Sequence, residues 1–411
     1  MTAAIRTKLS TMMFLEFFIW GSWFVTLGTF LGSNLKASGA ESGAVFSTQS
    51  WGAIIAPFIV GLIADRYFNA EKILGILHLI GALLMYQMYN ATNIGAFYPY
   101  VLSYMVLFMP TLALVNSVSF NQIENPEKEF SSIRIWGTIG WIVAGLLISY
   151  IFHWDSKQDT ENGFLKNTFL MAGIASLVLG LFSFTLPKTP PKVSSTEKIT
   201  ISDVLGLDAL SLLKDRNFLV FFISSILICI PLAFYYQNAN LFLSNIGVDN
   251  PTGKMTIGQA SEVLFLLFIP VFFSRFGFKK TILVGMLAWA LRYALFAYGN
   301  ATNLSFMLII GIALHGVCYD FFFVSGQIYT DSKAGEKYKS SAQGLITLAT
   351  YGVGMLIGFA VAGLITDTYK LADGAINWKM VWVIPAGIAA VVFLIFAFLF
   401  NDKSRSEIKT V

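Results

Sequence analysis

Apolar runs of membrane-spanning length recur from one end of the chain to the other, and they limit the fold more than any other feature. A transmembrane helix needs about 20 mainly apolar residues. Only α-helices and closed β-barrels satisfy their backbone hydrogen bonds inside a bilayer, and these runs are too long and too apolar for barrel strands. The sequence therefore predicts an all-α polytopic membrane protein with twelve transmembrane helices. The predicted spans are 10–31, 42–64, 72–90, 96–120, 132–152, 166–187, 217–243, 256–274, 280–299, 303–329, 340–367 and 379–400.

The composition agrees with a membrane protein and argues against several other classes. Of the 411 residues 56% are hydrophobic and only 12% are charged, whereas soluble domains carry about 25% charged residues. The net charge of +4 is small and dispersed, so we expect no nucleic-acid partner. Cys229 and Cys318 lie in apolar runs, and there are only three histidines, so no metal site and no cofactor is expected. The sequence carries neither HExxH nor GxSxG, which indicates that the chain is not an enzyme.

The positive charges between the predicted spans indicate the orientation in the membrane. With the N-terminus in the cytoplasm, 19 Lys and Arg residues fall in cytoplasmic segments and 6 fall on the opposite side. Because cytoplasmic loops carry an excess of Lys and Arg, this distribution predicts that both termini are cytoplasmic. Arg6 and Lys8 precede the first apolar run, and no small-residue cleavage site closes it, so we expect this run to remain as a span.

The longest connection between predicted spans divides the chain into two halves. It covers 188–216, begins next to a proline cluster and stays polar. We therefore expect an N-terminal six-helix bundle over 1–187, a cytoplasmic linker over 188–216 and a C-terminal six-helix bundle over 217–411. The text "DRYFNAEKIL" at 65–74 has a partner in "SRFGFKKTIL" at 274–283, which favours a duplicated six-helix unit.

Several short motifs resemble those of known transporters. "GLIADR" at 61–66 resembles the start of the loop signature of the major facilitator superfamily, although the later glycine and basic pair are missing. The resemblance implies that Asp65 and Arg66 lock a cytoplasmic gate by pairing between helices. The motifs "WGSW" (20–23), "IRIWGTIG" (133–140), "SRFG" (274–277), "LFAYG" (295–299), "YDFFFVSG" (319–326) and "SAQG" (341–344) resemble the bacterial nucleoside:proton symporter family.

This resemblance implies a function, a membrane and a set of partners. The chain is expected to import nucleosides with protons across the inner (plasma) membrane, by a cavity that opens alternately to each side. We expect it to work as a monomer in the lipid bilayer. The alternatives are a facilitator-type carrier for another polar solute such as a sugar, a drug exporter, or a receptor that binds without transporting.

Five charged residues fall inside predicted spans, and each needs a physical reason. A charge at the bilayer centre costs about 2.5–3.5 kcal/mol on insertion scales. The functional interpretation is a polar substrate cavity and a proton relay, and the alternative is helix–helix pairing or placement near an interface. The five residues are Glu16, Arg134, Glu262, Arg292 and Asp320.

Asp320 is the first candidate for proton coupling. It lies well inside the tenth predicted span between Tyr319 and three phenylalanines, and an apolar setting disfavours the ionised form of a carboxyl group. The resemblance also puts a functional aspartate at this position. A fixed structural partner is the alternative role, and Glu262 is the rival proton carrier.

Two pairs of polar residues lie on single helix faces and suit a nucleoside. Gln237 and Asn240 are three residues apart on the seventh span, and Gln259 and Glu262 have the same spacing on the eighth. Amides carry donors and acceptors that match a ribose diol and a base edge. The resemblance implies that these positions belong to the substrate site, and hydrogen-bonded helix packing is the alternative.

Two further stripes with i, i+4, i+7 spacing complete the predicted site. Arg134, Thr138 and Trp141 share one face of the fifth span, where the resemblance implies contact with substrate and Trp141 offers a surface for stacking a base. A gate role for Arg134 is the alternative. His315, Tyr319 and Phe322 form the second stripe, on the tenth span. The family tends to have tyrosine where His315 stands, so His315 is expected to alter base preference, add a protonatable group or serve in packing.

Two charges remain outside these stripes. Glu16 lies one turn before Trp20, at a position that looks amide-like in the family, so it provides an extra proton site or a salt bridge. Arg292 matches family text and is expected to be structural.

Overall fold

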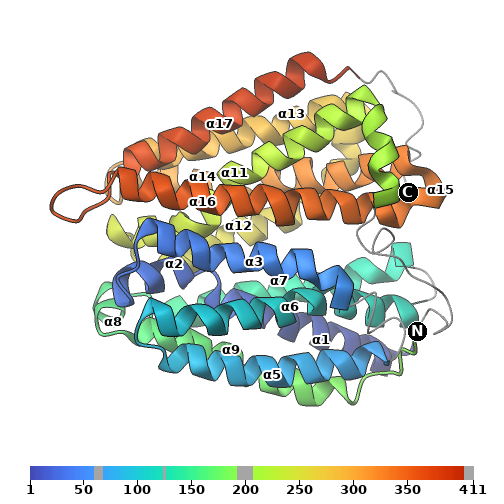
Figure 1. Cartoon of the computed structure of the whole chain (residues 1–411), viewed down its shortest axis with the longest axis horizontal. Coiled ribbons are helices and arrows are strands. Elements are labelled where there is room, and N and C mark those ends of the chain that lie inside the picture. Colours follow the sequence, from blue (N-terminus) through green and yellow to red (C-terminus); the bar gives the residue numbers. More distant parts are fainter. Residues whose placement is uncertain (60–67, 124–125, 192–206, 402–411) are drawn as a thin grey trace. The chain divides into compact units, whose positions relative to one another are not determined.

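The computed structural model describes residues 1–59, 68–123, 126–191 and 207–401, and these residues are helical apart from short connections and one isolated bridge between Lys370 and Ile376 (Figure 1). The predicted all-α fold is therefore confirmed for the part of the chain that is described. Its first half consists of α1 (Ala3–Trp23), α2 (Leu27–Thr29), η1 (Phe30–Asn34), α3 (Gly39–Ile59), α5 (Ala70–Asn90), α6 (Ile94–Gln122), α7 (Pro126–Leu146), η3 (Leu147–Ile151), α8 (Lys157–Glu161), η4 (Phe164–Lys166) and α9 (Asn167–Ser183). The second half consists of η5 (Leu207–Lys214), α11 (Arg216–Asn245), α12 (Pro251–Leu266), α13 (Ile269–Tyr298), α14 (Ser305–Tyr319), η6 (Asp320–Val324), α15 (Ser325–Thr347), η7 (Leu348–Gly354), α16 (Met355–Thr368) and α17 (Trp378–Leu399).

Among the described residues, ten helical stretches are long and apolar enough to cross a membrane. The predicted span at 42–64 overlaps α3 and then leaves the described residues. The predicted span at 256–274 is divided between α12 and the first part of α13. The total of twelve therefore stays a prediction.

Two long helices each contain a break at a glycine with positive φ. Gly277 has φ +74° within α13, and Gly335 has φ +62° within α15. A residue with a Cβ adopts this conformation only at an energetic cost, whereas glycine does so readily. Each break separates two helical pieces, so α13 and α15 contain parts of two predicted spans each.

The chain forms two compact units. Unit 1 contains 1–37, 45–199 and 249–256, and unit 2 contains 38–44, 200–248 and 257–411. These boundaries are defined by contacts between residues. The predicted division into bundles over 1–187 and 217–411 stays a prediction.

In unit 1, α1 packs against α7 and α9, and α5 packs against α6 and α9 (Figure 1). Small residues allow the closest approach between α1 and α7. A Cβ on Gly140 would overlap the Phe14 carbonyl of α1, and a Cβ on Gly137 would lie 2.6 Å from Phe17. Van der Waals packing between helices in a bilayer depends on such small residues.

In unit 2, α13 packs against α14 and α17, and α11 packs against α16 and α17. The hydroxyl of Tyr293 on α13 donates to the Pro231 carbonyl on α11 at 2.6 Å. Because proline has no N–H, the carbonyl four residues before Pro231 loses its usual helix partner. The carbonyl of Pro231 is a different group, and it accepts the bond from Tyr293. The contact joins two helices inside the apolar interior.

Two helix starts are capped by carboxylates from distant parts of the chain. In unit 2, the Asp367 carboxylate accepts from the Gly39 N–H at 2.6 Å and the Ala40 N–H at 2.8 Å. In unit 1, the Asp155 carboxylate accepts from the Thr252 N–H at 2.9 Å. The first N–H groups of a helix have no intrahelical acceptor, and a negative charge is favourable there.

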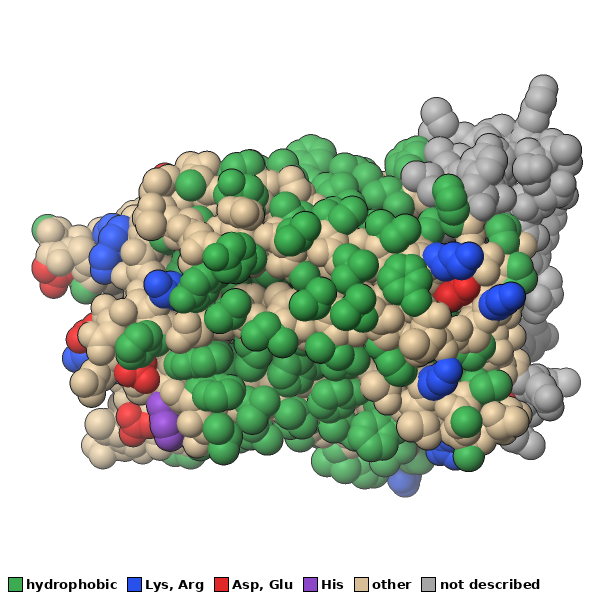
Figure 2. Space-filling model, turned by 90° about the horizontal axis from the view of Figure 1, so that it is seen from below, with side chains coloured by type: hydrophobic (Ala, Val, Ile, Leu, Met, Phe, Trp, Pro, Cys, Tyr) green, Lys and Arg blue, Asp and Glu red, His purple; other side chains and the backbone are tan. Residues whose placement is uncertain are grey.

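Large apolar side chains lie exposed along the helix flanks, while charged side chains gather toward helix ends (Figure 2). Leu83 of α5 is 68% exposed, Leu364 of α16 is 63% exposed and Phe398 of α17 is 81% exposed. Soluble monomers rarely expose continuous apolar surface of this kind, whereas a bilayer covers it.

Candidate functional site

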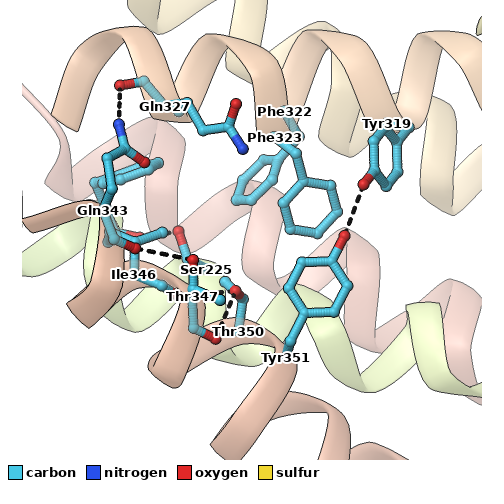
Figure 3. A pocket seen from close by; sticks show the side chains of 12 residues that line it. Ser225, Tyr319, Phe322, Phe323, Gln327, Gln343, Ile346, Thr347, Thr350 and Tyr351 are labelled. Carbon is cyan, nitrogen blue, oxygen red and sulfur yellow. Dashed lines mark hydrogen bonds between the residues drawn. The ribbon is translucent and has the colours of Figure 1, made fainter. Parts of the chain in front are cut away.

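Two π-helical turns lie in unit 2, and one of them begins at the predicted residue Asp320. One is η6 and the other is η7. π-helical turns are rare and occur frequently at functional sites. Tyr319, immediately before η6, and Tyr351, within η7, place their hydroxyl oxygens 2.6 Å apart (Figure 3). This hydrogen bond connects the two π-helical turns.

A pocket opens beside this tyrosine pair. Its volume is only about 30 Å³, so it is narrow in this conformation. Figure 3 shows aromatic rings on one side and amide and hydroxyl groups on the other. The Gln343 amide donates to the Gln327 carbonyl at 2.8 Å and to Asp331 Oδ1 at 2.6 Å. The lining residues are Phe221, Ser225, Tyr319, Phe322, Phe323, Gly326, Gln327, Gln343, Ile346, Thr347, Thr350 and Tyr351.

Tyr319 and Phe322, two members of the predicted stripe on the tenth span, are among these lining residues. Tyr351, Gln327 and Gln343 were not predicted from the sequence. Tyr351 lies in the segment "TLATYGVG" (347–354), a pattern that resembles ordinary helix packing. Its role becomes visible only because the fold places it opposite Tyr319.

Asp320 occupies the first position of η6, and its side chain is buried. Its Oδ2 atom has no hydrogen-bond partner among the described residues. Burying a polar group without a partner costs about 1–3 kcal/mol, and a charged group costs more. Asp320 is electrostatically coupled to Glu262, the rival proton carrier. The two predicted carboxyl groups therefore share one neighbourhood in unit 2.

A close contact between α12 and α14 explains this proximity. The Gly316 N–H donates to the Ser261 hydroxyl at 3.0 Å, and a Cβ on Gly316 would lie only 2.5 Å from the Glu262 nitrogen. Glycine is required here because the two backbones approach too closely for a side chain. The contact puts Glu262 beside the α14 segment that carries His315 and Tyr319.

His315 is held by Arg292 in a defined protonation state. Arg292 is fully buried, its Nη1 atom lies 3.0 Å from His315 Nδ1, and its guanidinium lies 3.5 Å from the centre of the Tyr235 ring. A guanidinium has donors and no acceptor, so Nδ1 accepts and the ring proton is on Nε2. His315 is therefore a neutral donor here, which disfavours its interpretation as an extra protonatable group.

The predicted amide pairs differ in burial. Gln237 and Asn240 are buried, and Gln237 Nε2 donates to the Gly39 carbonyl at 3.3 Å. Gln237 Oε1 has no partner among the described residues, which leaves one acceptor for a ligand. Gln259 and Glu262 on α12 are half-buried. The structure therefore keeps both pairs in unit 2.

The predicted residues of α7 lie in unit 1. Arg134, Thr138 and Trp141 are all half-buried, and the Arg134 guanidinium lies 4.0 Å from the centre of the Phe17 ring on α1. The Trp141 ring meets Trp20 edge-on at 5.5 Å.

Trp20 in turn meets Phe108 of α6 at 5.7 Å. We call Trp20, Phe108 and Trp141 the aromatic wall. Trp20 belongs to the "WGSW" motif but was not predicted as a site residue, and nothing in the apolar surroundings of Phe108 distinguishes it in the sequence. The wall offers flat apolar surface, a property shared by sites that stack a ring.

The predicted gate residues and Glu16 lie apart from the groups above. The gate residues Asp65 and Arg66 lie outside the described residues. Glu16, for which the sequence left open an extra proton site or a salt bridge, contacts His78 with 2.8 Å between Glu16 Oε2 and His78 Nε2.

Comparison with known proteins identifies the family. The family model described as "Nucleoside H+ symporter" matches residues 3–405. The chain belongs to the nucleoside H+ symporter family. It is 42% identical to the putative nucleoside transporter YegT of Escherichia coli K12, over 98% of this chain and 95% of the relative. It is 34% identical to the nucleoside permease NupG of the same organism, over 97% of this chain and 96% of the relative.

A solved structure agrees with the sequence comparison. The crystal structure of the nucleoside transporter NupG superimposes with a TM-score of 0.86 at 32% identity, over 97% of this chain and all of that chain. The predicted resemblance to nucleoside:proton symporters is thus confirmed. The family is one of multi-pass membrane transporters, so the expectation that the chain is not an enzyme is confirmed as well.

Proposed function

We propose that this protein imports nucleosides together with protons across the bacterial inner membrane by alternating access. Membership of the nucleoside H+ symporter family supports this function over a sugar carrier or a drug exporter. The observation that carries the mechanism is Asp320, a buried carboxyl group with an unpartnered oxygen, in a π-helical turn and coupled to Glu262.

Asp320 carries the coupling proton. A carboxylate in this position has no cation to compensate it among the described contacts of its unit, so ionisation strands a charge in an apolar interior. The conformation described here is compatible with a protonated Asp320, and release of the proton favours conformations that bring water or a partner to Oδ2. A proton shifts a conformational equilibrium by its differential affinity for the two states. Glu262 senses this change because the two groups are electrostatically coupled.

The nucleoside is bound by the residues that the sequence predicts, together with the aromatic wall. In unit 1, Trp141 and Trp20 supply ring surface for the base, and Arg134 and Thr138 supply donors. In unit 2, Gln237, Asn240 and Gln259 bind hydroxyl groups and base edges, as amides with both donors and acceptors do. Tyr319 and the neutral Nε2–H of His315 add further donors.

The topology completes the proposal. Six-helix bundles over 1–187 and 217–411 flank the cytoplasmic linker 188–216, both termini are cytoplasmic and the working unit is a monomer. Asp65 and Arg66 form the cytoplasmic gate, a role that rests on the loop motif alone.

The test is uptake of radiolabelled uridine and adenosine into liposomes that contain the purified protein. With an inward proton gradient, at least one nucleoside should rise above its external concentration, and without the gradient it should only equilibrate. Sucrose serves as the control solute and should stay outside. Gradient-driven accumulation of sucrose, with neither nucleoside entering, would refute the proposal.

A further inference from the structure

A buried hydrogen-bond network in unit 1 joins four helices around Glu16. Glu16 of α1 contacts His78 of α5 with 2.8 Å between Oε2 and Nε2. Its Oε1 lies 2.6 Å from the hydroxyl oxygen of Thr111 on α6, whose one proton is shared with the Phe108 carbonyl at 2.5 Å. His78 Nδ1 lies 3.1 Å from the hydroxyl oxygen of Ser176 on α9. All four side chains are at most 2% exposed.

The hydrogen-bond directions fix a proton on the ring. The Ser176 hydroxyl donates its one proton to the His78 carbonyl at 2.9 Å. Its oxygen is therefore the acceptor in the contact with Nδ1, and Nδ1 carries a hydrogen. This leaves Nε2 as the atom that faces the carboxyl group.

A second proton must lie between Nε2 and Oε2. A neutral ring with its hydrogen on Nδ1 has a lone pair on Nε2, and a lone pair does not bond a carboxylate oxygen. Either Glu16 is a carboxylic acid that donates to Nε2, or the ring is an imidazolium that donates to a carboxylate. In both cases the pair holds one shared proton and is neutral overall. Loss of this proton to water would leave a carboxylate beside a neutral ring, with one net negative charge.

The surroundings offer no cation that would compensate that charge. Among the described helices packed on Glu16, α6 contributes Tyr104, which is electrostatically coupled to Glu16. Arg134 of α7 is directed at the Phe17 ring at 4.0 Å, and Lys8 of α1 donates to the Thr185 carbonyl. On α5, Glu71 is engaged by the Thr189 N–H. The described α9 helix has no charged side chain. A net charge would therefore be stranded in the interior.

The network lies directly behind the aromatic wall. Glu16 precedes Trp20 by one turn of α1, Thr111 follows Phe108 on α6, and the His78 ring meets Phe108 edge-on at 6.2 Å. The network thus joins α1 and α6, which carry two of the three wall residues, and the shared proton ties α1 to α5 behind them.

We propose that Glu16 and His78 form a second protonatable site, separate from Asp320, whose single shared proton stabilises the arrangement of the aromatic wall described here. Release of the proton requires rearrangement of α1 against α5 and α6, because only then is the remaining charge hydrated. Protonation of this site and the shape of the nucleoside wall are linked. The site lies behind the substrate residues and takes a proton, not a nucleoside.

Glu16→Gln is the discriminating variant because it preserves the geometry. The Gln side-chain NH₂ group donates to the Nε2 lone pair, and its oxygen still accepts from Thr111, so every hydrogen bond is kept while the exchangeable proton is lost. Ser176→Ala is the complementary variant. It removes the acceptor that orients Nδ1, so the ring proton is free to move to Nε2 and the pair no longer requires a shared proton.

The first readout is the proton itself. The chain has three histidines, so ¹⁵N-histidine labelling gives a spectrum that His153→Asn and His78→Gln variants assign. We expect either a protonated carboxyl band in the infrared spectrum that Glu16→Gln removes, or an imidazolium signal from His78. An ionised Glu16 beside a neutral His78 in the unchanged protein would overturn the proposal.

The second readout is the linkage to nucleoside binding, measured by calorimetry from pH 5.5 to 8.5. Each proton linked to binding changes log Kd by about one per pH unit. The slope for Glu16→Gln should be smaller than for the unchanged protein by up to about one, with an unchanged Tm. Asp320→Asn should remove a separate contribution, so that the double variant is flatter than either single variant. An unchanged slope in a well-folded Glu16→Gln protein would reduce the pair to a structural contact and refute the linkage.

Discussion

Substitution of Asp320 by asparagine tests the coupling mechanism with little disturbance of the fold. The carboxamide has almost the same shape as a protonated carboxyl group and cannot ionise. In the structure Oδ2 has no hydrogen-bond partner among the described residues. The neutral acid and the amide therefore leave one buried polar group unsatisfied in equal measure, and we expect the stability to change by less than about 1 kcal/mol.

The same substitution should have a much larger effect on nucleoside accumulation than on stability. An inward gradient of one pH unit provides about 1.4 kcal/mol per proton, which supports a concentration ratio of about ten for one proton per nucleoside. Asp320→Asn should still bind nucleoside and exchange it across the membrane. Its accumulation ratio should fall to about one because no proton moves with the substrate.

The assay is uptake into liposomes with an imposed pH gradient, run in parallel on Asp320→Asn and Glu262→Gln. Counterflow exchange on the same preparations controls for protein that has lost binding. If Asp320→Asn still concentrates nucleoside while Glu262→Gln does not, the proton belongs to Glu262 and the assignment of Asp320 is wrong.

Three further predictions concern the site and the topology. Nucleoside binding should weaken by about 1–3 kcal/mol, or roughly 5- to 150-fold in calorimetric Kd, in each of the variants Gln237→Ala, Asn240→Ala and Gln259→Ala. The control is Asn238→Ala, which lies on α11 but is bonded to Thr366 at 3.1 Å and should leave Kd unchanged. Equal effects in all four variants would assign the four amides to helix packing. Trp141→Ala should weaken nucleoside binding by about 1–3 kcal/mol, the stacking energy of one base. Trp136→Ala, on the same helix and 43% exposed, should leave binding unchanged. A larger loss for Trp136→Ala than for Trp141→Ala would remove Trp141 from the site. A cysteine at Asn300 should react with a membrane-impermeant reagent in intact cells and one at Ser195 should not, against the background of the buried Cys229 and Cys318; the opposite pattern would reverse the orientation.

The fold class was predictable because membrane spans depend on a local property, the length and polarity of a run. The break at Gly277 falls in the predicted connection between the spans 256–274 and 280–299, where basic residues interrupt the apolar run. The boundary between α12 and α13, at 267–268, was not predictable in the same way. It lies inside an apolar run, and only the backbone shows that the helix ends there.

The site was predictable in part, because spacing along one helix shows which residues share a face but not what they meet. Gln237 and Asn240 are both buried on α11, as their spacing allows. The partners of Arg292 and Glu16 come from other helices, 23 and 62 residues away. No local pattern encodes His315 as the acceptor for Arg292 or His78 as the partner of Glu16. The charges inside spans could be identified from the sequence, whereas their partners required the fold.

The two protonatable sites act on the same conformation in the same sense. Asp320 has an oxygen without a partner, so its ionisation penalises the conformation described here. The Glu16–His78 pair is fully bonded only while it holds a proton, so proton loss penalises the same conformation. A proton shifts an equilibrium toward the state that binds it more tightly. Both sites therefore favour this conformation when they are protonated, although they belong to different units. Deprotonation of either one weakens it, and deprotonation of both should shift the equilibrium further than either alone.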